Sequence, residues 1–194
     1  MGLVEVERKR VLTGSGEEVR RRLVELDYRE CSSVTEVDTY YSRPDVDFLA
    51  TVECLRVRRR DGFAEITYKP ASSASTHGPD GVVAKPETDV VLSDPGQAHQ
   101  AEQLLEAVGM VFLVRMEKFR TLFRNPAHPD LTVALDAVTG VGVFLETEIV
   151  SEDREGAVIR LGEVEDLLGV TSCPVVSLPY RDLVLQSRQA ETRT

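Results

Sequence analysis

The alternation of apolar and polar positions along the chain predicts a protein built mainly of β-strands. Eight segments alternate apolar with charged residues or are rich in Val, Leu, Ile, Thr, Phe and Tyr, and Gly, Pro or Asp separates most of them. We therefore expect strands at residues 3–12, 34–42, 52–60, 63–69, 84–92, 110–124, 131–138 and 143–150. Between two of these segments, Asp61-Gly62 predicts a tight hairpin turn.

Helical periodicity and glycine stops predict helices between the strands. The first runs from about Gly16 to Tyr28 and places Val19, Leu23 and Leu26 on one side. Further helices are expected over residues 96–108 and 152–168, ended by Gly109 and Gly169, and over a short segment after Pro179. Together these elements indicate an antiparallel α+β protein with one domain over residues 1–185 and a flexible tail over 186–194.

Residues 70–82 predict a mobile loop. Small and polar residues dominate this stretch, which has little to bury. Its single histidine, His77, is interpreted as a solvated residue and not as a ligand.

Composition and charge narrow the function classes. The 194 residues include 42% hydrophobic and 29% charged residues, as in ordinary globular proteins. A net charge of −10 argues against a main role in binding nucleic acid or an anionic membrane. The cysteines Cys31, Cys54 and Cys173 form no CxxC pair, so neither a disulfide framework nor a zinc site is expected. No apolar run suggests a signal sequence or a membrane span, and we expect a cytoplasmic protein.

Charged residues recur two apart on strand after strand. Successive side chains of a strand point to opposite faces, so residues two apart share a face. This spacing joins Glu5, Glu7 and Lys9; Arg56 and Arg58; Glu87 and Asp89; Lys118 and Arg120; and Glu146 and Glu148, while Lys69 and Asp136 stand singly.

Two interpretations of this pattern stay open. Each pair taken alone could face water, as on one side of many antiparallel sheets. Neighbouring charges of equal sign repel on an open face, however, and need a counter-ion. If the sheet closes into a barrel, its acidic clusters would suit a hard cation and its basic clusters phosphate oxygens. The apolar residues of the opposite face, such as Leu55, Val57 and Phe119, would then need helices to cover them.

The segment Val4 to Lys9 reads Val-Glu-Val-Glu-Arg-Lys, an ExExK motif. This motif resembles the signature of the CYTH family, the triphosphate tunnel metalloenzymes. The other matching blocks are Asp38-Thr39-Tyr40-Tyr41, Leu55-Arg56-Val57-Arg58, Ile66-Thr67-Tyr68-Lys69, Glu117-Lys118-Phe119-Arg120, Leu135-Asp136 and the run from Gly142 to Glu148. Because these blocks occur in the family's order, the resemblance covers residues 4 to about 185.

The resemblance implies an eight-stranded antiparallel barrel or tunnel with helices outside, and chemistry on triphosphates with Mg²⁺ or Mn²⁺. By similarity, the metal-facing carboxylates are Glu5, Glu7, Asp136, Glu146 and Glu148. The phosphate ligands by similarity are Lys9, Arg56, Arg58, Lys69, Lys118 and Arg120, and Glu87 with Asp89 forms a further acidic pair. A homodimer is expected from the family alone.

Two reactions fit the resemblance. The N-terminal half resembles thiamine triphosphatases, in which Tyr40 and Lys9 would help to activate water. The C-terminal half, including Pro179-Tyr180-Arg181-Asp182-Leu183, is closer to class IV adenylyl cyclases, although Pro179 replaces their usual serine. The leading hypothesis is therefore an adenylyl cyclase that converts ATP to cyclic AMP and pyrophosphate. The alternatives are a triphosphatase acting on thiamine triphosphate, inorganic triphosphate or a nucleoside triphosphate, and a binding module without catalysis.

Overall fold

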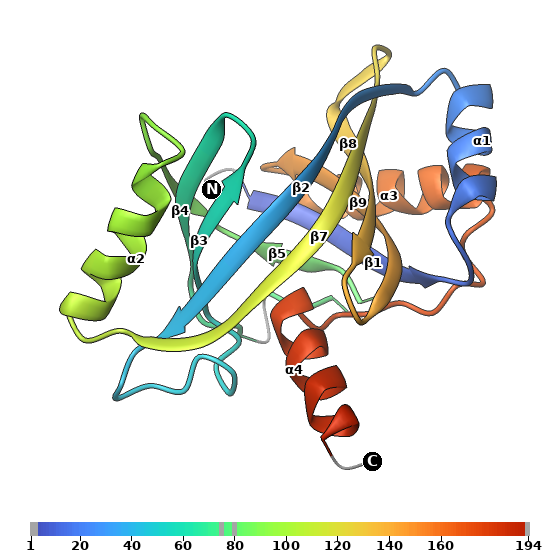
Figure 1. Ribbon diagram of the computed structural model, residues 1–194. Helices are drawn as coiled ribbons and strands as arrows, with labels where there is room; N and C mark the ends of the chain where they lie inside the picture. Colours follow the sequence, from blue (N-terminus) through green and yellow to red (C-terminus); the bar gives the residue numbers. More distant parts are fainter. Residues whose placement is uncertain (1–3, 74–75, 79–80, 193–194) are drawn as a thin grey trace.

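The computed structural model describes residues 4–73, 76–78 and 81–192, in which one curled antiparallel sheet carries helices on its outer side (Figure 1). Within these residues the strands are β1 (Val4–Leu12), β2 (Arg29–Ser42), β3 (Cys54–Arg60), β4 (Phe63–Lys69), β5 (Val83–Lys85), β6 (Thr88–Val91), β7 (Val111–Asn125), β8 (His128–Val138) and β9 (Gly142–Ser151). The helices are α1 (Glu17–Glu25), α2 (Gln97–Ala107), α3 (Arg154–Leu168) and α4 (Tyr180–Glu191).

The two edge strands of the sheet follow each other directly in the sequence. The order is β5-β1-β9-β8-β7-β2-β3-β4-β6, and the edge strands β5 and β6 are joined by Pro86 and Glu87 alone. The backbone therefore connects one edge directly to the other, but β5 pairs with β1 and β6 with β4, so the described sheet is a half-barrel and not the closed barrel that was expected.

The prediction of one strand over residues 84–92 was wrong. β5 pairs with β1, for example Glu5 with Lys85, whereas β6 pairs with β4, for example Thr67 with Asp89. Pro86 lies at the break, and a proline has no N–H with which to continue a ladder of hydrogen bonds. The sheet accordingly has nine described strands in place of eight.

The helices bury the outer, apolar face of the sheet at two places. Leu23 of α1 and Leu161 of α3 are fully buried in a cluster with Val6, Val133 and Ile149 of β1, β8 and β9. The second cluster places Ala98 and Ala101 of α2 against β3 and β4, where it covers Leu55 and Val57 as expected.

Phe119 contradicts the expectation that helices cover the whole apolar face. Its side chain is 47% exposed on the outer side of β7, between Thr35 of β2 and Ala137 of β8. In the described part of the chain, α2 packs on β3 and β4, and α3 on β1 and β9, so neither helix lies over the middle of β7.

Helix α4 packs across one end of the sheet. Tyr180 and Val184 join a third apolar cluster with Tyr40, Met116 and Phe144, which come from β2, β7 and β9 (Figure 1). The helix extends to Glu191, well into the segment 186–194 that was expected to be a flexible tail.

The remaining boundaries differ in detail. β2 begins at Arg29, five residues before the predicted start. The predicted loop 70–82 includes residues 74–75 and 79–80, which lie outside the described residues; within the described part, His77 forms a β-bridge with Val83. No described helix has the length and apolar character needed to cross a bilayer.

Candidate active site

The inner face of the sheet lines a cavity of about 260 Å³. Eleven of the twelve predicted site residues line it, namely Glu5, Glu7, Lys9, Tyr40, Arg56, Arg58, Lys69, Lys118, Arg120, Glu146 and Glu148. Of the further acidic pair, Glu87 lines the cavity, whereas Asp89 is exposed and accepts a hydrogen bond from Thr67 Oγ1 at 2.7 Å. The alternating charges therefore converge and do not face bulk water.

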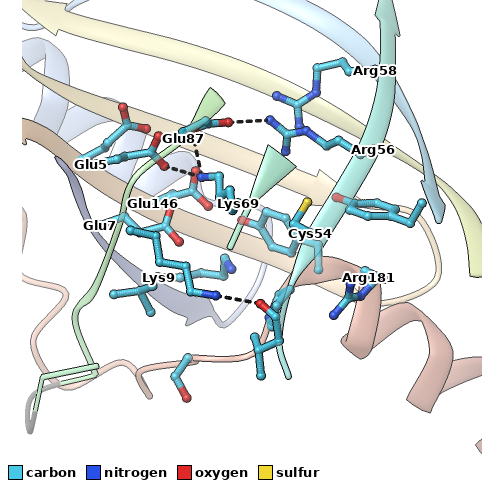
Figure 2. A pocket seen from close by; sticks show the side chains of 18 of the residues that line it. Glu5, Glu7, Lys9, Cys54, Arg56, Arg58, Lys69, Glu87, Glu146 and Arg181 are labelled. Carbon is cyan, nitrogen blue, oxygen red and sulfur yellow. Dashed lines mark hydrogen bonds and ion pairs between the residues drawn. The ribbon is translucent and has the colours of Figure 1, made fainter. Parts of the chain in front are cut away.

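Strand register places these side chains beside one another. Glu7 is paired with Glu148, and Lys9 with Glu146, across β1 and β9. Each pair and its neighbours two residues along point to the same face, so the ExExK segment and the Glu146–Glu148 segment form one continuous patch. Figure 2 shows Glu5, Glu7 and Glu146 on one side of the cavity and Arg56 and Arg58 on the other.

The carboxylates of Glu5, Glu7 and Glu148 form an acidic cluster with few neutralising partners. Burial, together with Glu146 and Glu7 nearby, raises the pKa of Glu148 to about 7. Burial and the neighbouring carboxylates, Glu87 first, also raise the pKa of Glu5, although Lys69 Nζ donates to Glu5 Oε1 at 2.8 Å. Such shifts are those of buried carboxylates that lie close to one another.

Two arginines of the opposite wall are held by pairs of hydrogen bonds. Arg58 donates to both carboxylate oxygens of Asp38, each at 2.7 Å. Arg120 donates to both oxygens of Asp136, at 2.7 and 2.6 Å, and to Glu146 at 2.6 Å. Paired hydrogen bonds of this kind fix the plane of a guanidinium group, so both arginines are oriented before any ligand binds.

The positive charges of these arginines lower the pKa values of the carboxylates beside them. Burial alone would raise the pKa of Asp38, but the attraction of Arg58 lowers it far below the ordinary range of aspartate. For Glu146, Arg120 likewise outweighs burial and lowers the pKa. Both carboxylates are thus ionised at neutral pH.

All four lysines of the sequence line this one cavity. Lys69 lies 2.8 Å from Glu5 and 3.0 Å from Glu87, and Lys118 lies 3.3 Å from Glu36. Lys9 and Lys85 are different, because their contacts in the described structure are with main-chain carbonyls and not with carboxylates. Lys9 Nζ donates to Leu178 O at 3.2 Å, and Lys85 Nζ donates to Val52 O and Pro70 O at 2.7 and 3.0 Å.

Tyr40 and Lys9, the predicted catalytic pair, have different partners. The Tyr40 hydroxyl donates to Asp38 Oδ2 at 3.2 Å, and burial next to Asp38 raises the pKa of Tyr40. The Lys9 ammonium lies over the ring of Tyr180, 4.1 Å from its centre. Tyr40 therefore keeps its proton, and the aromatic neighbour of Lys9 comes from α4.

Asp136 does not line the cavity as a metal ligand would. It is fully buried behind Arg120, and its oxygens also lie near Lys118 at 3.6 Å. Its contacts make it a residue that orients Arg120.

Sequence reasoning missed several residues of the site. Glu36 and Asp38 have the period-two spacing with Tyr40 that identified the other charges, so the same signal could have found them. Lys85 lies two residues before Glu87, but Pro86 obscured the strand there. Arg181 donates to Glu53 O and Phe48 O at 2.6 and 3.1 Å, and no period predicts where α4 packs. His77, expected in solvent, lines the cavity.

The acidic cluster fits a divalent cation that is shared with a ligand. Glu7 and Glu148 are directly opposed like charges, an arrangement that is unfavourable without a proton or a cation between them. Among the described residues, no three carboxylates, histidines or cysteines converge closely enough to enclose an ion by themselves. Mg²⁺ is commonly bound by one or two carboxylates together with phosphate oxygens and water, and this donor set matches that pattern.

Comparison with known proteins identifies the family. The model of the CYTH domain matches residues 3–166, which is most of the chain. The chain belongs to the CYTH family. A protein of Methanocaldococcus jannaschii, provisionally named an adenylate cyclase, is 25% identical over 184 residues, which cover 93% of this chain and 98% of that one.

Solved structures of low sequence identity share the fold of this CYTH protein. A protein of Pyrococcus horikoshii superposes with a TM-score of 0.76 at 22% identity, covering 92% of this chain and 98% of the other. A Hippeastrum protein, provisionally assigned as an adenylyl cyclase and reported to show a dominant triphosphatase activity, has a TM-score of 0.64 at 14% identity and 91% coverage of both chains. The expected antiparallel α+β fold with helices outside is confirmed, as a nine-stranded half-barrel in the described residues and not as an eight-stranded barrel.

Proposed function

We propose that this CYTH protein is a divalent-metal-dependent adenylyl cyclase that converts ATP to cyclic AMP and pyrophosphate. The observation that carries the proposal is the division of one cavity into an acidic cluster on β1 and β9 and a wall of oriented arginines on β3 and β7. Phosphoryl chemistry needs mainly positioning and neutralisation of charge, and this arrangement supplies both.

The reaction joins and breaks bonds at the α-phosphorus. The ribose 3′-hydroxyl oxygen attacks the α-phosphorus, and the bond from that phosphorus to the oxygen bridging to the β-phosphate breaks. Pyrophosphate leaves with the bridging oxygen, and the proton of the 3′-hydroxyl is released to solvent. A divalent cation held by Glu5, Glu7 and Glu148 would lower the pKa of the attacking hydroxyl and neutralise phosphate charge. Arg56 would contact the phosphate oxygens as a guanidinium fork, and Arg58 and Arg120 would contact them with the N–H groups that their carboxylate partners do not occupy.

Lys9 is placed to receive negative charge that develops during the reaction. Its ammonium lines the cavity, and its contacts in the described structure are a main-chain carbonyl and an aromatic ring. Since no carboxylate neutralises it at ion-pair distance, its charge is available to a phosphate group.

The alternative is a triphosphatase, in which water attacks a terminal phosphorus and phosphate leaves. The same cavity would suit it, and the Hippeastrum relative of this fold is reported with that activity. Tyr40 is a weak candidate to activate the water, because burial and Asp38 raise its pKa.

Product analysis decides between the two reactions. Purified protein is incubated with ATP and Mn²⁺, and the products are separated by ion exchange. The cyclase predicts cyclic AMP and pyrophosphate in equal amounts. Phosphate without either product would eliminate the cyclase and favour the triphosphatase.

A matched pair of variants tests the acidic cluster. Glu5→Gln keeps the size of the side chain but removes the charge, so we expect turnover to fall by on the order of 100-fold or more. Glu117→Gln is the control, because Glu117 is exposed on the outer face of β7. Full activity of Glu5→Gln would refute the assignment of the cluster.

A further inference from the structure

The lining of the cavity contains a neutral part that the triphosphate chemistry leaves unexplained. Fourteen of the 22 lining side chains are Glu, Lys or Arg. Among the others, Val52, His77, Val83, Ser177 and Pro179 come from the loop before β3, from β5 with the loop before it, and from the segment before α4. We refer to these five residues as the neutral mouth.

Two of these segments lie next to each other along one edge of β1. Val83 is paired with Glu7, and Val176 N donates to Lys9 O at 2.9 Å. Glu7 and Lys9 are two residues apart on β1. Val176 therefore lies along the same edge of β1 as β5, beyond the end of β5 at Val83. Ser177 and Pro179 therefore belong to the segment that leaves this edge on the side of Val83, and both line the same cavity.

The loop before β3, which contains Val52, is held next to β5 by Lys85. The Lys85 ammonium donates to Val52 O at 2.7 Å, which holds the loop before β3 against β5. Val52 has a φ of 55°, a conformation that is strained for a β-branched residue. Strain of this kind persists only where surrounding contacts enforce it, and here Lys85 provides one.

His77 completes the neutral mouth from the opposite side of Val83. It forms a β-bridge with Val83, and Ala84 N donates to Thr76 O at 2.8 Å. The imidazole Nδ1 lies 3.2 Å from Thr76 Oγ1, so the orientation of the ring is restrained. Its partial exposure leaves ring surface toward the cavity.

The neutral mouth lies toward one end of the cavity, beside Lys9 and Lys85 and away from Arg58. In Figure 2, Arg58 lies toward one end, and Lys9 and Arg181 lie toward the other. Lys9 donates to Leu178 O, between Ser177 and Pro179, so the neutral mouth lies at the Lys9 end. Inorganic triphosphate has no apolar group and would gain little from such a surface, whereas an uncharged organic group avoids the ionic part.

We propose that the neutral mouth binds the organic group of the substrate, and that His77 stacks against a planar ring of that group. Nucleobases commonly stack on aromatic side chains, histidine included. The inference depends on the proposed function only in that the ionic part of the cavity holds a triphosphate. It assigns to this protein an organic triphosphate with a flat ring and not inorganic triphosphate.

Binding measurements on two ligands test this assignment. One is an ATP analogue in which methylene groups replace both bridging phosphate oxygens, and the other is the matching analogue of inorganic tripolyphosphate. Neither can lose phosphate or pyrophosphate, so calorimetry at fixed Mg²⁺ concentration gives equilibrium Kd values. For His77→Ala we expect a Kd about tenfold higher for the ATP analogue and changed by less than about twofold for the tripolyphosphate analogue.

Two further variants control the experiment. His77→Phe keeps an aromatic face and should restore the Kd of the ATP analogue. His99→Ala removes a histidine whose side chain is 72% exposed on α2, and it should change neither value.

The outcomes separate the two levels of the proposal. Equal changes for both ligands, or no change for either, would overturn the role of the neutral mouth while leaving the triphosphate site in place. If the unaltered protein binds neither analogue, the proposed function itself is wrong.

Discussion

At the scale of single residues, Glu148 connects the burial of the acidic cluster to stability. Its pKa in the folded protein is raised to about 7 from 4.5, by burial first and by Glu146 and Glu7 next. Between these two pH values the folded state binds more protons than the unfolded state, so this group lowers stability as the pH rises through the window. We expect Glu148→Gln to stabilise the metal-free protein at pH 8 by about 1 kcal/mol or more, since one pKa unit corresponds to about 1.4 kcal/mol.

Urea unfolding in the presence of a chelator measures this effect. At pH 5 the variant and the unaltered protein should have similar free energies of unfolding, because Glu148 is then largely protonated. Glu117→Gln, on the opposite face of the sheet, should match the unaltered protein at both pH values. A variant that is no more stable at pH 8 than at pH 5, relative to the unaltered protein, would contradict the electrostatic explanation.

At the scale of elements, Lys85 joins two connecting segments that Ser72 N also links, by donating to Thr51 O at 2.9 Å. Its hydrogen bonds to Val52 O and Pro70 O link the loop after β2 to the segment after β4. Hydrogen bonds from a charged group contribute about 1.5–3 kcal/mol each, so Lys85→Met should destabilise the protein by about that amount. Amide hydrogen exchange should quicken selectively at residues 48–53.

A control for this loop is available within it. Arg43 contacts Asp45 in an exposed ion pair, a type of contact that contributes little to stability. Arg43→Met should therefore leave both the unfolding free energy and the exchange of residues 48–53 unchanged. Equal exchange in Lys85→Met and the unaltered protein would show that the loop is held by other contacts.

The elements also show what the sequence could predict and what it could not. Period-two alternation identified the inward side chains of β1, β3, β7 and β9, because strand geometry alone decides which face a residue takes. Asp136 satisfies the same alternation, yet Arg120 separates it from the cavity, and only the packed structure reveals that. Tyr180 and Arg181 reach the site through the docking of α4, which depends on tertiary contacts and not on a local period.

At the scale of the whole molecule, a chain with a net charge of −10 concentrates positive charge in its interior. Lys9, Lys69, Lys85 and Lys118 lie in the cavity together with Arg56, Arg58, Arg120 and Arg181. A negatively charged ligand is therefore held by local contacts and against the field of the outer surface. The connection through Pro86 and Glu87 keeps both edges of the sheet around this interior.

Because every lysine of the sequence lines the cavity, reagents and proteases that act on lysine measure the accessibility of that cavity. Lys9, Lys85 and Lys118 are buried, and the side chain of Lys69 is only 19% exposed. An endoprotease specific for lysine should thus leave the native protein intact, whereas trypsin should cut at exposed arginines, as mass spectrometry would reveal. Rapid cleavage by the lysine-specific enzyme under native conditions would argue against the burial of these lysines. A small acylating reagent should label them less when an occupant shields them, so occupancy becomes readable from mass without any enzymatic assay.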